Sequence, residues 1–150
     1  MDADLIVGLL VTPEKRLASP KGDVLRAIKR SSPGFAGFGE TYFSTIHEGV
    51  VKGWRRHTRV TLNLVVPIGR IRFVVHDDRP GSASTGRFSE VTLGGPDHSR
   101  LTVPPGLWMA FQGLGAGTSL LLNLIDEEHD PTESDTVDLQ TFRFDFSVPP

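Results

Sequence analysis

The 150-residue chain contains no cysteine. This absence excludes disulfides, thiolate zinc sites, iron–sulfur clusters and cysteine nucleophiles. Long apolar runs are also missing, since none approaches the roughly 18 residues that a transmembrane helix needs. The first residues are acidic, whereas a signal peptide begins with positive charge. We therefore expect a protein of the cytoplasm with no membrane partner.

Charge of one sign has no large excess, because 16 basic residues stand against 18 acidic ones and the net charge is −2. This balance does not indicate a nucleic-acid partner. The charges are unevenly placed: residues 1–80 hold 13 basic and 8 acidic side chains, and residues 81–150 hold 3 and 10. Two interpretations stay open. The basic half binds a small anionic ligand, or the two halves attract each other within a monomer or across a dimer.

Glycine (16) and proline (11) are frequent, and they divide the chain into short segments rich in β-branched and aromatic residues. This pattern predicts one all-β domain over residues 1–150, a sandwich or a barrel. The expected strands cover residues 41–46, 50–54, 60–66, 71–75, 88–93, 100–103, 107–112, 119–125 and 142–146. Residues 60–66 and 71–75 alternate at period 2 around a Pro67–Gly69 turn, which predicts a β-hairpin.

Three segments carry a resemblance to a known family: Lys52–His57 (Lys-Gly-Trp-Arg-Arg-His), Arg100–Gly106 (Arg-Leu-Thr-Val-Pro-Pro-Gly) and Glu128–Pro131 (Glu-His-Asp-Pro). With them, the chain from about Pro20 to Glu133 resembles the dTDP-4-dehydrorhamnose 3,5-epimerase family of cupins. The resemblance implies a cupin-type jelly-roll β-barrel (a double-stranded β-helix) with an N-terminal arm. It also implies a homodimer that exchanges N-terminal strands, a nucleotide-sugar substrate, and epimerisation next to a ketone without a cofactor.

The same resemblance implies candidate residues for substrate binding. Lys21 stands where the family has an arginine that reaches the nucleotide of the partner subunit. Glu40 and Tyr42 stand at positions that contact the base, and Lys52 replaces the arginine of the family's Arg-Gly-Leu-His motif. Three positions depart from the family. Its catalytic histidine falls on Arg55, which stays protonated and cannot act as a base. A second histidine falls on Met109, and no tyrosine stands near residues 126–128, where the family has its acid.

His57 is the best replacement for the missing base. If residues 55–63 form one strand, then Arg55, His57, Arg59, Thr61 and Asn63 share a face. Such a polar face either meets solvent or lines a pocket, and the resemblance favours the pocket. Arg55 would hold a phosphate or polarise the ketone, and Asn63 would bind the substrate. His129, within Glu128–Asp130, is the second catalytic candidate; the alternative is a solvated acidic loop.

The remaining histidines and the tryptophans have structural interpretations. We interpret His76 and Asp77 as a structural pair, because neighbours in a strand point to opposite faces. His47 and His98 stand in turns and are expected at the surface, and Trp54 and Trp108 are expected in the core. A metal site is not expected, because a metal-binding cupin needs a His-x-His motif, a following Glu and a later His.

These observations support two functions. The first is a cofactor-free epimerase or isomerase of a nucleotide-activated 4-keto-6-deoxy sugar, in which His57 moves the proton. The second is a cupin that binds a nucleotide sugar or another carbohydrate without catalysis. For either function we expect a homodimer formed through the apolar segment Leu5–Val11, which a small barrel has little room to bury.

Overall fold

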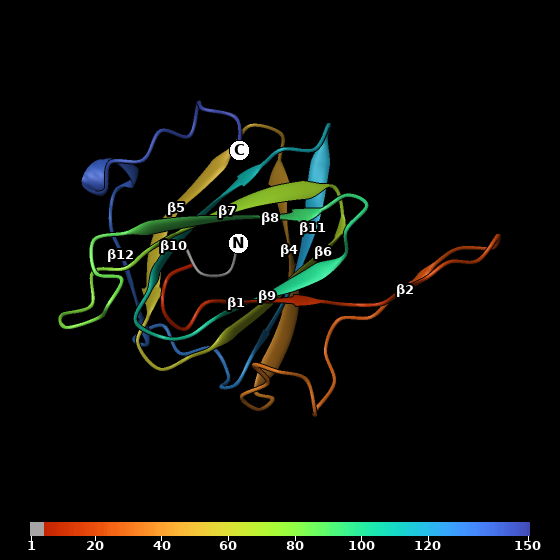
Figure 1. Cartoon of the computed structure of the whole chain (residues 1–150), viewed down its shortest axis with the longest axis horizontal. Coiled ribbons are helices and arrows are strands. Elements are labelled where there is room, and N and C mark those ends of the chain that lie inside the picture. The colour runs from red at the N-terminus through yellow and green to blue at the C-terminus, as the bar shows by residue number, and fades with distance from the viewer. Residues whose placement is uncertain (1–4) are drawn as a thin grey trace.

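The computed structural model describes residues 5–150, which fold into two facing antiparallel sheets (Figure 1). The first sheet has the order β1-β9-β6-β11-β4 and the second sheet has the order β12-β5-β10-β7-β8. The strands are β1 (Leu10–Pro13), β2 (Arg16–Leu17), β3 (Val24–Leu25), β4 (Glu40–His47), β5 (Val51–His57), β6 (Leu62–Ile68), β7 (Arg70–His76), β8 (Phe88–Gly94), β9 (Ser99–Val103), β10 (Trp108–Gly113), β11 (Thr118–Ile125) and β12 (Ser134–Thr136).

Helix is almost absent from the described residues, which contain one 3-10 turn, η2 (Leu139–Thr141), as their helical element. No helix within residues 5–150 is long and apolar enough to cross a membrane. The all-β jelly-roll class expected from the sequence is confirmed.

From β4 onward the chain alternates between the sheets, except where β7 pairs with β8. The hairpin expected from residues 60–66 and 71–75 is therefore wrong, because β6 pairs with β9 and β11 while β7 pairs with β10 and β8. At the crossing, Gly69 has φ +87°, and a Cβ there would collide with Ser119. Glycine thus permits a sharp turn that carries the chain from one sheet to the other.

Apolar side chains between the two sheets form the main core. Ile71, Phe73 and Val75 of β7 and Leu64 and Leu101 of the first sheet are all almost completely buried. Burial of this kind supplies most of the folding free energy, at about 25 cal/mol per Å² of apolar surface. It also fixes the separation between the sheets, and therefore the space in which a site can form.

A second core lies on the outer side of the second sheet, where the C-terminal segment covers it. Trp54 and Trp108 are buried there, as expected, against Phe142, Phe144 and Phe146. The strand expected over residues 142–146 is wrong, because that segment packs its alternate phenylalanines onto the sheet instead of pairing with an edge strand.

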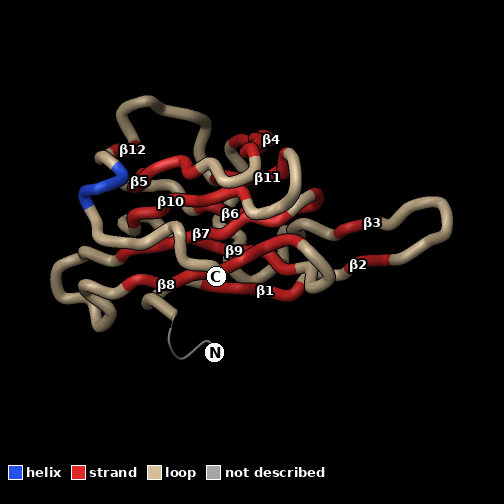
Figure 2. Tube along the Cα trace, turned by 90° about the horizontal axis from the view of Figure 1, so that it is seen from above, coloured by secondary structure: helices blue, strands red, loops and turns tan. Residues whose placement is uncertain are grey.

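The N-terminal segment folds back onto its own chain. Ile6 and Leu9 are buried in the main core, and β1 pairs with β9 of the same chain. The reason for expecting Leu5–Val11 at a dimer interface is thereby removed. Instead, β2 and β3 form a separate two-stranded ribbon that projects from the body (Figure 2).

One histidine expected at the surface is buried. His98 is 8% exposed, and its Nε2 lies 2.6 Å from the carbonyl oxygen of Arg26, while its own carbonyl accepts a hydrogen bond from the Glu14 amide. The expectation of an exposed His98 is wrong because the base of the ribbon packs over this turn.

Candidate active site

A cavity of about 530 Å³ opens between the two sheets. Both sheets and the turn after β9 contribute to its walls. The lining residues are Tyr42, Ser44, Lys52, Gly53, Trp54, Arg55, His57, Leu62, Leu64, Val103, Pro104, Leu107, Met109, Phe111, Leu121, Asn123, Thr136 and Val137. Its apolar floor and small set of polar groups are typical of a site for a small molecule.

Strand β5 brings three candidate residues to this cavity, Lys52, Arg55 and His57. Because side chains alternate along a strand, Arg55 and His57 line the cavity while Arg56 stacks over Trp108 on the other side of the sheet, 4.6 Å from the ring centroid. The second core therefore fixes the outer side of β5 and holds its inner side toward the cavity.

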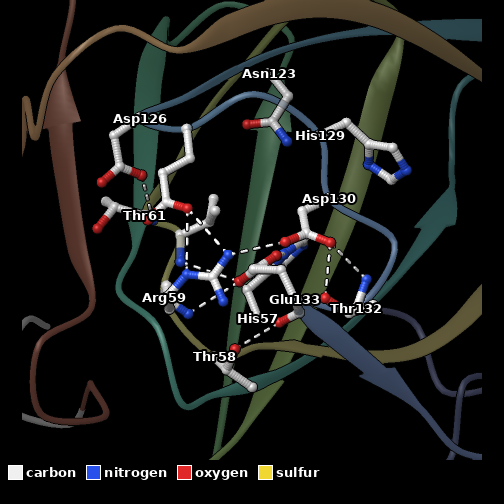
Figure 3. Close-up of polar contacts among 12 residues, drawn as sticks. His57, Thr58, Arg59, Thr61, Asn123, Asp126, His129, Asp130, Thr132 and Glu133 are labelled. Atoms are coloured by element: carbon white, nitrogen blue, oxygen red, sulfur yellow. Dashed lines mark hydrogen bonds and ion pairs between the residues drawn. The ribbon is translucent and has the colours of Figure 1, made fainter.

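His57 is paired with a carboxylate that the sequence analysis did not select. Its Nδ1 lies 2.7 Å from Oε1 of Glu133, just before β12 (Figure 3). Because a carboxylate only accepts hydrogen bonds, Nδ1 is the donor, and Nε2 of the neutral ring is left free to take a proton. A base held in one tautomer by a carboxylate is the arrangement expected of a catalytic histidine.

Glu133 is itself held in place by the loop after β5. The side chain is 6% exposed, and its Oε2 accepts hydrogen bonds from the backbone N–H groups of Arg59 (3.0 Å) and Val60 (3.1 Å). Burial acts to raise the pKa of the Glu133 carboxyl. The hydrogen bonds from Arg59, His57 and Val60 outweigh burial, and the pKa lies below its usual range. Glu133 therefore stays ionised beside His57.

Arg59 supports this loop from outside the cavity. Its guanidinium bonds to Asp130 (Figure 3) and to Glu127, both at 3.2 Å. The single strand expected over residues 55–63 is not formed, because β5 ends at His57 and β6 starts at Leu62 in the other sheet. Arg59 and Thr61 therefore do not share the cavity with His57. Pairing between the basic and acidic halves of the chain occurs within one molecule, as one interpretation of the charge distribution expected.

The first sheet supplies the opposite wall. Tyr42 and Ser44 point inward from β4, and Asn123 points inward from the neighbouring position on β11. The Asn123 side-chain amide donates to the Tyr42 hydroxyl at 3.0 Å. Two cations stand on the side of β5: Arg55, and Lys52, whose Nζ donates to the Thr45 carbonyl at 2.7 Å. These groups suit an anionic, oxygen-rich ligand.

The structure thus brings together four of the eight residues selected from the sequence: His57, Arg55, Tyr42 and Lys52. His129 is exposed and lies apart from the His57–Glu133 pair (Figure 3). Its backbone N–H donates to Glu40, at 2.8 Å, and neither residue lines the cavity.

The last two selected residues also lie elsewhere. Asn63 is 2% exposed and points away from the cavity, where its side chain bonds to Gly34, Arg100 and Thr102. Its neighbours Leu62 and Leu64 take the inward positions. Lys21 lies in the turn of the ribbon, between β2 and β3.

His76 and Asp77 have structural surroundings, as expected. The His76 ring lies between Phe88 and Phe142, at 4.3 and 4.4 Å between centroids. Asp77 accepts hydrogen bonds from Arg79 and Ser84 in the corner after β7. His47 is exposed, in agreement with the sequence analysis. No group of three or more metal-ligating side chains gathers within residues 5–150.

Glu133 and Asn123 were not predicted from the sequence. Both come from the acidic second half, and both are buried. The uneven charge distribution pointed to contacts between the halves, but it did not say which acid meets His57. Asn123 lies in a predicted strand among leucines, where a lone polar residue is a signal for a buried partner or a cavity.

No protein-family model matches the chain. A probable low-salt glycan biosynthesis epimerase of Haloferax volcanii is 30% identical over 96 residues, which are 63% of this chain and 62% of that protein. A dTDP sugar isomerase of Desulfovibrio desulfuricans has a solved structure that is 33% identical. That match covers 91% of this chain and 87% of the other, with a TM-score of 0.87.

More distant structures share the fold. A dTDP-4-dehydrorhamnose 3,5-epimerase of Sulfolobus tokodaii is 24% identical, covers 92% of this chain and 81% of its own, and has a TM-score of 0.79. The identity to the Desulfovibrio protein, over most of both chains, shows more than a common fold. The chain belongs to the family of dTDP-4-dehydrorhamnose 3,5-epimerases and related sugar epimerases.

Proposed function

We propose that the protein is a cofactor-free epimerase or isomerase of a nucleotide-activated 4-keto-6-deoxy sugar, with a dTDP sugar as the first candidate. The observation that carries the proposal is the His57–Glu133 pair in the cavity between the sheets. A C–H bond next to a ketone is acidic enough for a histidine base when the resulting enolate is stabilised.

The cavity supplies the groups that this reaction needs. Nε2 of His57 takes the proton, and Glu133 holds the ring and stabilises its cationic form. Arg55, a permanent cation on the same wall, stabilises either the enolate oxygen or the diphosphate. Lys52 adds a second cation for the nucleotide sugar. The apolar floor around Leu62 and Leu64 keeps the reacting carbons away from water, which strengthens these electrostatic interactions.

The proposal includes a homodimer and action in the cytoplasm. The ribbon of β2 and β3 exposes Leu17 (43%) and Val24 (57%), and Lys21, in the turn of the ribbon, does not line the cavity of its own chain. In that position, Lys21 would contact a bound nucleotide only in a second copy of this chain. We therefore assign the dimer contact to the ribbon rather than to Leu5–Val11.

Hydrogen exchange at carbon tests the proposed function. A dTDP-4-keto-6-deoxy sugar is incubated with the protein in D₂O, and deuterium entry at C3 and C5 is followed by NMR. Wild type should exchange at one or both carbons, and His57→Ala should be slower by about 10²–10⁴-fold, the usual contribution of a general base. His47→Ala, at an exposed position outside the cavity, is the control. Tight binding without exchange in wild type would instead support a carbohydrate-binding cupin.

A further inference from the structure

An epimerisation through an enolate needs two groups on opposite sides of the substrate, one to remove the proton and one to return it to the other face. The cavity is bounded by two sheets, and His57 stands on the second sheet. The partner of His57 must therefore be sought on the first sheet.

Four strands of the first sheet line the cavity with Tyr42, Ser44, Leu62, Leu64, Val103, Leu121 and Asn123. Leucine and valine carry no proton that can be transferred, an asparagine amide does not donate one under physiological conditions, and a serine hydroxyl is a very weak acid. Among the described residues of this wall, Tyr42 is the one with a titratable side chain.

The local geometry prepares Tyr42 to give up a proton. The side chains of Tyr42, Ser44 and Ile46 alternate with those of Phe43 and Thr45 along β4. Ile46 is buried at 2% and Phe43 is exposed at 66%, so Tyr42 is on the inner face.

Tyr42 and Asn123 are direct register partners, and the Asn123 amide donates to the phenol oxygen. The phenol oxygen is thus an acceptor in this bond, and its own hydrogen stays available for a ligand. The same bond stabilises the phenolate left after proton transfer.

We propose that Tyr42 is the proton donor of the reaction, acting on the face of the substrate opposite to His57, with Asn123 as its positioning residue. The inference rests on the proposed epimerase function. Nε2 of His57 takes the C–H proton, and the electron pair forms the enolate with the C4 oxygen. The carbon then takes the hydroxyl proton of Tyr42 on the other face. Water returns a proton to the phenolate and removes one from the imidazolium, so the enzyme is regenerated without a further reactant.

The test separates proton removal from inversion. In D₂O, Tyr42→Phe should still remove the proton through His57 and return deuterium to the same face, so the recovered starting epimer becomes labelled. Formation of the inverted product should fall by about 10²–10⁴-fold. Ser44→Ala tests the other hydroxyl on this wall.

Three results would overturn the proposal: inversion by Tyr42→Phe at the wild-type rate, loss of exchange together with inversion in Tyr42→Phe, or loss of inversion in Ser44→Ala instead. Absence of exchange in wild type is a different result, since it overturns the proposed function itself.

A second measurement does not depend on the folding of a variant. Tyr42 is the only tyrosine in the chain, so growth with 3-fluorotyrosine changes this position alone. Fluorine makes the phenol more acidic. The fall of the inversion rate at alkaline pH should therefore move to lower pH, whereas the pH dependence of the exchange rate should not change. An unchanged pH dependence of the inversion rate would contradict the role of Tyr42.

Discussion

Trp54 meets Phe142 edge-on, with ring centroids 5.4 Å apart and planes at 86°. The Trp54 indole N–H also donates to the carbonyl of Leu139 at 3.0 Å. These contacts tie the C-terminal segment to the strand that carries His57, on the side of β5 away from the cavity. The C-terminal segment follows Glu133 in the chain, and Trp54 lies on the same strand as His57. The packing of Trp54 against this segment therefore supports both His57 and Glu133.

Truncation of Phe142 should therefore loosen the C-terminal segment. Its ring also contacts His76 and Trp108, at 4.4 and 5.6 Å between centroids. Because Phe142 is only partly buried, Phe142→Ala should cost about 2 kcal/mol, below the 3–5 of a fully buried phenylalanine. Thermal unfolding should show a melting temperature lower by about 4–8 °C. Phe43→Ala, at a 66% exposed position, should change it little. Equal effects of the two variants would contradict the packing argument.

Neutralising Glu133 should remove the support for the base. Glu133→Gln keeps the size of the side chain, but its amide can hold the imidazole in the wrong tautomer. We expect deuterium exchange at C3 and C5 to fall by about 10²–10⁴-fold, the range for loss of a general base or of the carboxylate that orients it. Asp135→Asn is the matched control, because Asp135 pairs with Arg56 at the surface. Exchange at the wild-type rate in Glu133→Gln would show that His57 acts without it.

Much of the fold could be predicted from the sequence because period-2 alternation reports strands directly. The segments 41–46, 88–93, 100–103, 107–112 and 119–125 all correspond to observed strands. Pairing was harder, since the Pro67–Gly69 turn has the composition of a hairpin turn but crosses between sheets. Which sheet a strand joins is decided by burial on both sides, and β6 and β7 are buried almost throughout. Their local sequence pattern therefore does not indicate which strand each of them pairs with.

The candidate site was predictable only in part, for a similar reason. Arg55, His57 and Lys52 lie on one short strand, and Tyr42 lies on the strand before it. The resemblance to the epimerase family located them, because the family's motifs fall on these two segments. Glu133 meets His57 across 76 residues of chain. Such a contact depends on β12 pairing with β5, which no short-range pattern indicates. Asn63 was misplaced because the break at Thr58–Thr61 moves β6 into the other sheet and reverses which side chains face the cavity.

The loss of folding stability at acid pH should depend on Asp77. Hydrogen bonds from the Arg79 side chain, opposed by burial and supported by Ser84 and Ser82, hold the pKa of this carboxyl far below its usual range. A depressed folded pKa means that its stabilisation is complete above the unfolded pKa of about 3.9 and is lost as pH falls toward the folded value. Asp77→Asn should lower the free energy of unfolding by about 1–3 kcal/mol at neutral pH. Below pH 5, the stability of this variant should fall less steeply than that of wild type. Chemical denaturation from pH 7 to 3 measures both effects, with Asp97→Asn as the exposed control. If the stability of Asp77→Asn fell with pH as steeply as that of wild type, this assignment would be contradicted.

The ribbon should control assembly. Wild type is expected to be a dimer at micromolar concentration by light scattering, because exposed Leu17 and Val24 have no cover within the chain's own core. The double variant Leu17→Asp/Val24→Asp should be a monomer. The free energy of unfolding of that monomer should change little. Ile68→Asp, also at an exposed apolar position but outside the ribbon, should remain dimeric. A monomeric wild type would remove the dimer from the proposed function.

Ligand binding should depend on Lys52. A dTDP sugar at 100 times its Kd should stabilise wild type by about 2.7 kcal/mol, or about 5–11 °C in melting temperature for a chain of this size. Lys52 is a cation on the wall of the cavity, and loss of a charged hydrogen bond weakens binding by roughly 10–100-fold. At the same ligand concentration, the shift for Lys52→Ala should therefore fall to between about a half and about a sixth of the wild-type value. Each shift is measured against the ligand-free protein of the same variant, because Lys52 also bonds to Thr45. Lys15→Ala, at an exposed lysine outside the cavity, should keep the full shift. An equal shift in Lys52→Ala would place the anionic part of the ligand elsewhere, and Arg55→Ala would then be the variant expected to lose it.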